Sequence, residues 1–175
     1  MDIKEALQDV QTIKSVAAGL PRKRDSIYVL LTVIYRIGRK WIKGGLSSAL
    51  RDAVAAHEGI KVDRRAKRNV FRFLIEITYR VEIKLRPRYA NALRYARARN
   101  CLPAGLTDFI KSAGGIEECA KKYKNISRTK RKFASSEQHG DNEGRNGSAW
   151  AQIMDVRDVY CHVRCSLKAL KSLTI

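Results

Sequence analysis

The sequence predicts an all-α protein, in which a compact multi-helix domain is followed by a flexible linker and a long C-terminal amphipathic helix. Apolar residues recur at spacings of three and four along the first 125 residues, as they do on the buried stripe of a helix. The same residues contain none of the Asn-Gly or Asp-Gly pairs that are typical of β-hairpins. We therefore predict a basic helical core domain at 1–125, a basic segment at 126–133, a linker at 134–149 and a helix at 150–175.

Three helices are expected before residue 60. Asp2 is the predicted N-cap of the first, which ends at Gly19 and Pro21. The second begins after Asp25 or Ser26 and ends at Gly44-Gly45; its wide apolar stripe predicts a central position in the core. The third begins after Ser47 or Ser48 and ends at Gly59. The stripe of the second helix comprises Ile27, Leu30, Leu31, Ile34, Ile37, Trp41 and Ile42.

The middle of the chain, from Lys61 to Arg99, is both amphipathic and strongly basic. It holds thirteen Lys or Arg residues and three acidic ones. Asp63 is expected to begin one long helix that ends at Pro87, with Val70, Phe73, Leu74, Ile77 and Val81 on its apolar face. The cations expected on the opposite face are Arg64, Arg65, Lys67, Arg68 and Arg72.

Further short helices are expected up to residue 125. Pro87 suits the first turn of a helix that carries Arg94 and Arg97. Leu102–Gly105 is a predicted loop, and Thr107 is the predicted cap of a helix that Gly114-Gly115 ends. The next helix has acids in its first turn and Lys121, Lys122 and Lys124 in its last, as the helix dipole favours.

The C-terminal part has two contrasting patterns. Residues 134–149 contain three glycines and no large apolar side chain, which predicts a flexible linker. Beyond it, apolar residues alternate at spacings of three and four, as in a heptad repeat. This helix either packs on its own core or forms a homodimer, through Ile153, Val156, Tyr160, Val163, Leu167 and Leu170.

The charge of the chain points to a polyanionic partner. It has 36 Lys and Arg residues against 17 acidic ones, a net charge of +19. Such a surplus repels itself in the folded state, and a bound polyanion relieves this repulsion. Nucleic acid is the expected partner, and DNA is favoured over RNA. Binding to an anionic membrane and a role as a merely basic assembly subunit are the weaker hypotheses.

Residues 115–133 resemble a helix-turn-helix. Ala120 is the small residue between the two helices, and Ile126-Ser127 form the turn and the N-cap of the second helix. That helix would present Arg128, Lys130, Arg131 and Lys132 to the major groove. The alternative is a basic arm that binds phosphates without reading bases, since seven of the twelve residues from Lys121 to Lys132 are basic.

Residues 85–115 resemble the small helical core-binding domains of tyrosine recombinases. The catalytic set of that family is not matched, because His162-Val163-Arg164 lacks the His-x-x-Arg spacing and no nucleophilic tyrosine follows. We therefore expect no recombinase activity and assign no family.

Little in the sequence indicates catalysis. The three histidines have no partner at a diagnostic spacing, and no glycine-rich phosphate loop occurs. Cys161, His162 and Cys165 lie close together but lack the paired spacings of zinc modules, so neither a metal site nor a cofactor is expected. The protein is expected not to be an enzyme.

The start of the chain and its cysteines bear on location. No secretory signal is visible at the N-terminus, and no apolar run is long enough to span a membrane. The four cysteines are therefore interpreted as reduced thiols of a cytoplasmic protein.

The sequence thus predicts a duplex-DNA-binding protein: a transcription regulator, an accessory protein of a mobile element, or a nucleoid-type protein. Two alternatives stay open. Tyr79, Tyr89 and Tyr95 lie among arginines and would stack on the bases of RNA or single strands. An assembly subunit that oligomerises through its C-terminal helix is the other.

Overall fold

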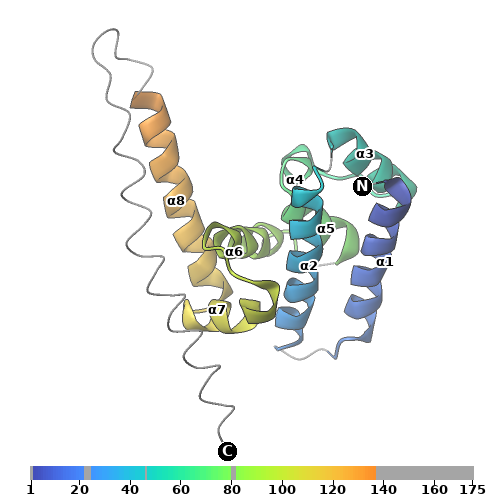
Figure 1. Cartoon of the computed structure of the whole chain (residues 1–175), viewed down its shortest axis with the longest axis horizontal. Helices are drawn as coiled ribbons and strands as arrows, with labels where there is room; N and C mark the ends of the chain where they lie inside the picture. Colours follow the sequence, from blue (N-terminus) through green and yellow to red (C-terminus); the bar gives the residue numbers. More distant parts are fainter. Residues whose placement is uncertain (1, 22–24, 46, 80–81, 137–175) are drawn as a thin grey trace, which may run out of the picture. The chain divides into compact units, whose positions relative to one another are not determined.

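The structure, a computed structural model, describes residues 2–21, 25–45, 47–79 and 82–136 (Figure 1). This part of the chain contains helices and no strand, which confirms the all-helical prediction for it. Residues Met1–Phe133 form one compact unit. The predicted linker, apart from residues 134–136, and the predicted C-terminal helix with its oligomerisation residues lie outside the described residues.

The first three helices begin and end close to the predicted residues. They are α1 (Ile3–Gly19), α2 (Ser26–Lys43) and α3 (Ser48–His57). The Asp2 carboxylate accepts a hydrogen bond from the Glu5 backbone N–H, and the Ser47 hydroxyl accepts one from Leu50, so both predicted caps are confirmed. Asp25 occupies the N-cap position of α2, but its side chain makes no capping hydrogen bond.

The predicted long helix from Asp63 to Pro87 is wrong. Two helices replace it: the single turn α4 (Arg64–Lys67) and α5 (Val70–Thr78). The break occurs because Asn69 adopts an extended conformation, where its side chain accepts hydrogen bonds from the backbone N–H groups of Phe71 and Arg72. A second capped helix therefore starts where a continuous one was expected, and α5 ends well before Pro87.

Helix α5 lies at the centre of the fold, in contact with α1, α2, α4 and α6 (Figure 1). It is buried on more than the one predicted stripe: Phe71, Phe73, Leu74, Ile75 and Ile77 are all in the core. The apolar stripe predicted for α2 is largely confirmed, since Leu30, Leu31, Ile34, Ile37 and Trp41 are buried.

Helices α2 and α5 approach closely at Gly38. The ring of Phe71 is stacked on Tyr35 with 5.7 Å between ring centroids, and Phe71 is 1% exposed. A Cβ at Gly38 would lie 2.5 Å from Cε1 of Phe71. The close crossing of the two helices therefore requires a residue without a side chain at position 38.

We predict that Gly38→Ala lowers the free energy of unfolding by about 1 kcal/mol, because overpacking of a core costs about 1–3 kcal/mol and outweighs the gain of about 1 kcal/mol in helix propensity. The matched control is Gly19→Ala in the last turn of α1, where a Cβ would meet nothing within 4 Å. Urea denaturation of the two variants measures the difference. Equal stabilities would contradict the close crossing.

The second half of the domain contains α6 (Arg86–Ala98), a 3₁₀ turn (Pro103–Gly105), α7 (Leu106–Ser112) and α8 (Ile116–Ser136). Pro87 lies in the first turn of α6, as predicted. Gly105 rather than Thr107 occupies the N-cap position of α7, so that the predicted Thr107 cap is wrong. Gly114 and Gly115 have positive φ angles and separate α7 from α8, as predicted.

The segment that follows α6 is hydrogen-bonded to α2 through one backbone carbonyl. Asn100, with φ of 52°, turns the chain after α6. The carbonyl of Cys101 then accepts hydrogen bonds from the Tyr35 hydroxyl at 2.8 Å and from Nη1 of Arg39 at 2.7 Å. Both donors come from α2, so the C-terminal halves of α2 and α6 are held against each other.

Candidate nucleic-acid interface

Two arginines of α4 and the arginine at its C-cap form an exposed positive surface. The α4 turn is set by Asp63, whose carboxylate accepts a hydrogen bond from the Arg65 backbone N–H, and by the burial of Ala66. This arrangement leaves Arg64, Arg65 and Arg68 exposed. They line an open hollow of about 250 Å³, and we call them the arginine triad.

The arginine triad has no acidic partner among the residues that the structure describes. None of its side chains takes part in an ion pair within the described part of the chain. Their neighbour Lys67 differs, since its Nζ lies 2.7 Å from Oδ1 of Asp52 on α3. All four residues are predicted from the sequence to bind phosphates, but only Lys67 is paired with an acid in the described part of the chain.

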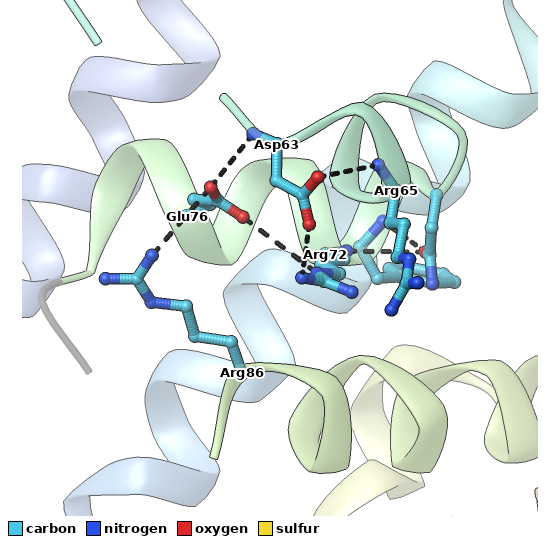
Figure 2. Close-up of polar contacts among 7 residues, drawn as sticks. Asp63, Arg65, Arg72, Glu76 and Arg86 are labelled. Carbon is cyan, nitrogen blue, oxygen red and sulfur yellow. Dashed lines mark hydrogen bonds and ion pairs between the residues drawn. The ribbon is translucent and has the colours of Figure 1, made fainter. Parts of the chain in front are cut away.

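Arg72 belongs to an internal charge network (Figure 2). Its Nη2 lies 3.0 Å from Oδ2 of Asp63, and its Nε lies 3.9 Å from Oε2 of Glu76. Oε1 of Glu76 also accepts a hydrogen bond from the Asp63 backbone N–H at 3.2 Å and lies 3.8 Å from Nη1 of Arg86. Arg72 thus connects the start of α4 to α5, and its charge is already balanced within the fold.

Some of the predicted cations on α6 and α8 contact an acid, a carbonyl or an aromatic ring within the fold, and we call them engaged; the others are unengaged. The Arg94 guanidinium lies 4.4 Å from the centre of the Tyr123 ring, a cation–π contact between the two helices. Nζ of Lys122 donates to the carbonyl of Ala113, and Lys121 pairs with Glu118 at 2.7 Å. The predicted cations of α6 and α8 that make no ion pair, side-chain hydrogen bond or ring contact among the described residues are Arg97, Lys124 and Arg128, all exposed.

The ion pair between Lys121 and Glu118 shifts the pKa of both side chains. Its hydrogen bond raises the pKa of Lys121 and lowers the pKa of Glu118. Both side chains are exposed, so the pair is screened by solvent and contributes little to stability. Lys121 stays close to its partner and is a weaker candidate for phosphate than Lys124 or Arg128.

The helix-turn-helix prediction is wrong. Helix α8 runs without interruption from Ile116 to Ser136, across the predicted turn at Ile126-Ser127. No glycine or proline occurs between these bounds, and the Thr129 hydroxyl bonds to the Asn125 carbonyl within the helix. Residues 126–133 are therefore neither a separate recognition helix nor an irregular arm. The side chains of Lys130, Arg131 and Lys132 lie outside the described residues.

The tyrosines proposed for base stacking pack in the core. Tyr95 is 7% exposed, and its ring lies 5.6 Å from that of Phe109. Tyr79 and Tyr89 are half-buried against the same core, and burial raises the pKa of Tyr89. Burial therefore removes Tyr95 as a platform for bases, and packing against the core leaves Tyr79 and Tyr89 only partly exposed.

Three cations of α2 were not predicted as site residues, because the apolar stripe of this helix indicates only a core element. Arg39, Lys40 and Lys43 recur at helical spacing on the last turns of α2, next to its apolar stripe. They line a second open hollow of about 370 Å³ together with Ile42 and with Arg97 of α6. The spacing of these three cations in the sequence is the signal from which this positive surface could have been predicted.

Groups suited to catalysis or metal binding are scarce. Within the described ranges, no three His, Cys, Asp or Glu side chains come close enough to hold a metal ion. His57 is exposed in the last turn of α3. Cys119 is buried, and this burial raises the pKa of its thiol, which disfavours the reactive thiolate. Cys161, His139, His162 and Cys165 lie outside the described residues.

Comparisons with family models, with curated proteins and with solved structures find no match to this chain. None of the helices in the described ranges is both long enough and apolar enough to cross a membrane.

Proposed function

We propose that this chain binds nucleic acid, duplex DNA in preference to RNA, through contacts to backbone phosphates. The observation that carries the proposal is the arginine triad: three exposed guanidinium groups on one short stretch with no acidic partner in the described part of the chain. Guanidinium groups bind phosphate oxygens in a bidentate manner. Counterion release from the bound polyanion supplies most of the affinity in such contacts.

The other unengaged cations extend this surface charge. Arg97, Lys124 and Arg128 are exposed and contribute to the same excess of positive charge, which totals +19 over the chain. The engaged cations, such as Arg72, have lower affinity for phosphate because binding would have to compete with an existing ion pair.

Duplex DNA is preferred over single strands because of the packing of the tyrosines. Recognition of single strands and of RNA loops depends on aromatic rings that stack on unpaired bases. Tyr95 is buried, and Tyr79 and Tyr89 pack against the core. The remaining chemistry is the attraction of cations to phosphates, which is strongest where the phosphates are densest, on a duplex.

Contacts to phosphate alone position a protein on DNA without reading its sequence. With α8 continuous, the helix-turn-helix predicted at 115–133 is not available to insert into the major groove. The proposed activity is therefore of the accessory or nucleoid type, with weak sequence preference, rather than that of a regulator bound to one operator.

Fluorescence anisotropy at physiological ionic strength tests this proposal. The full chain is titrated into a labelled random duplex, the matched single strand and an RNA hairpin. We expect the tightest binding to the duplex and equal binding to duplexes of unrelated sequence. Tighter binding to the hairpin would replace DNA with RNA as the partner, and absence of binding to all three would overturn the proposal.

A further inference from the structure

The second hollow, between α2 and α6, is a candidate binding site of its own. Its volume of about 370 Å³ lies in the range of small-ligand pockets. Four of its five lining residues are cations, Arg39, Lys40 and Lys43 from α2 and Arg97 from α6. Two elements that are distant in sequence thus converge on one concave, positive surface.

Arg39 is held in place before any ligand binds. Its Nη1 donates to the Cys101 carbonyl at 2.7 Å, and its guanidinium lies 5.7 Å from the centre of the Tyr35 ring. A guanidinium has five N–H donors, so this hydrogen bond leaves others for a ligand. Because Arg39 is already ordered, ligand binding here costs less side-chain entropy of the protein than binding to a free surface arginine would.

The charge of the hollow remains positive after its internal partners are considered. Nζ of Lys40 lies 2.9 Å from Asp9 and 3.0 Å from Glu5, and hydrogen bonds to these carboxylates raise the pKa of Lys40. Lys40 therefore stays protonated, and its positive charge is balanced by these two carboxylates. Arg39, Lys43 and Arg97 have no acidic partner in the described part of the chain.

The helix ends near the hollow reduce this charge without cancelling it. Lys43 is in the last turn of α2 and Arg97 in the last turn of α6. The C-terminus of each helix carries a partial charge of about −0.5, so the two together offset about one of the three cations. A site with an excess of about two positive charges matches a phosphate group.

We propose that this hollow binds a phosphate group through Arg39, Lys43 and Arg97. This inference rests on the proposed function: the phosphate group belongs to the backbone of the bound nucleic acid. The hollow is then a second contact site, in addition to the arginine triad. Free inorganic phosphate shares the same chemistry and is the alternative source of the ligand.

The test uses the full chain and the double variant Lys43→Gln/Arg97→Gln, which leaves the Arg39–Cys101 hydrogen bond intact. The charge-matched control is Lys4→Gln/Lys84→Gln, which removes two exposed lysines from α1 and from the turn before α6. Backbone amide NMR spectra are recorded with a random duplex and, separately, with inorganic phosphate. Salt titrations of duplex binding accompany them.

We expect the duplex to shift the amides of residues 39–45 and 97–101 in the native chain and in the control. The double variant is expected to lose these shifts and to bind duplex about 5-fold more weakly at physiological ionic strength, with a salt slope flatter by about 0.9, since the loss of one phosphate contact removes about 0.9.

Two results would overturn the inference. If the double variant binds duplex like the control, and the amide shifts are confined to α4, the hollow is not a phosphate site although the proposed function stands. If the native chain binds no nucleic acid, the proposed function fails, and the phosphate titration decides alone. Shifts at the hollow that the double variant abolishes would then support a free-phosphate site, whereas no shifts would overturn it.

Discussion

Replacing the arginine triad with glutamine, in the variant Arg64→Gln/Arg65→Gln/Arg68→Gln, is expected to weaken duplex binding about 100-fold at physiological ionic strength. Each phosphate contact contributes about 0.9 to the slope of log affinity against log salt, so the loss of three flattens it by about 2.7. The three side chains are exposed and unpaired within the described residues, so the fold should be unaffected.

The control for this prediction removes the same charge elsewhere. Lys4→Gln/Lys84→Gln/Lys111→Gln replaces exposed lysines on α1, before α6 and on α7. If the effect came from net charge alone, the two triple variants would bind duplex equally. We expect the control to retain most of the affinity and the native slope, and thermal denaturation to show that both variants are folded.

The second large effect is expected at Glu76. Glu76→Ala should lower the free energy of unfolding by about 2 kcal/mol, because it removes the contacts of one carboxylate to Arg72, to Arg86 and to the Asp63 backbone N–H, and leaves Arg72 with Asp63 alone. The Glu76 side chain is 9% exposed, and its loss removes the nearest acid to Nε of Arg72, which is buried and makes no hydrogen bond. Chemical denaturation measures the change.

Glu117→Ala is the control, since Glu117 is 61% exposed and pairs with Arg88 at 3.6 Å on the surface. Its expected cost is at most about 1 kcal/mol. Under conditions where Glu76→Ala is folded, duplex affinity should not decrease, because the variant loses a negative charge and keeps the arginine triad. A stability equal to that of the native chain would show that the network is not needed to hold α4, α5 and α6 together.

The elements that were predicted correctly are those with local signals. The caps Asp2 and Ser47 and the stops Gly44-Gly45 and Gly114-Gly115 act on neighbouring residues, so short sequence patterns identify them. The apolar stripe of α2 is long enough for its helical period to be unambiguous.

Two of the wrong helix boundaries involve polar residues with a choice of hydrogen-bond partners. Asn69 interrupts a helical pattern by capping α5, whereas Asn125 and Ser127 lie inside α8 without interrupting it. Asn and Ser side chains compete with the backbone for hydrogen bonds in either setting, and packing decides which one prevails. Sequence spacing alone does not contain that information.

The sequence could predict that the candidate site is rich in cations, but not which of these cations are paired within the fold. The excess of cations in residues 61–99 was evident from the sequence. The pairing of Lys67 with Asp52, of Arg72 with Asp63 and of Arg94 with Tyr123 depends on tertiary contacts between helices. The oligomerisation residues of the predicted C-terminal helix lie outside the described residues and stay a prediction.

The salt dependence of binding to a random duplex tests the central claim most directly. If five to eight phosphates are neutralised, log affinity falls with log salt at a slope of about −5 to −7. A steep slope in that range is the predicted result. A flat slope, or no binding near physiological salt, would contradict the account and assign the charge of +19 to another kind of partner.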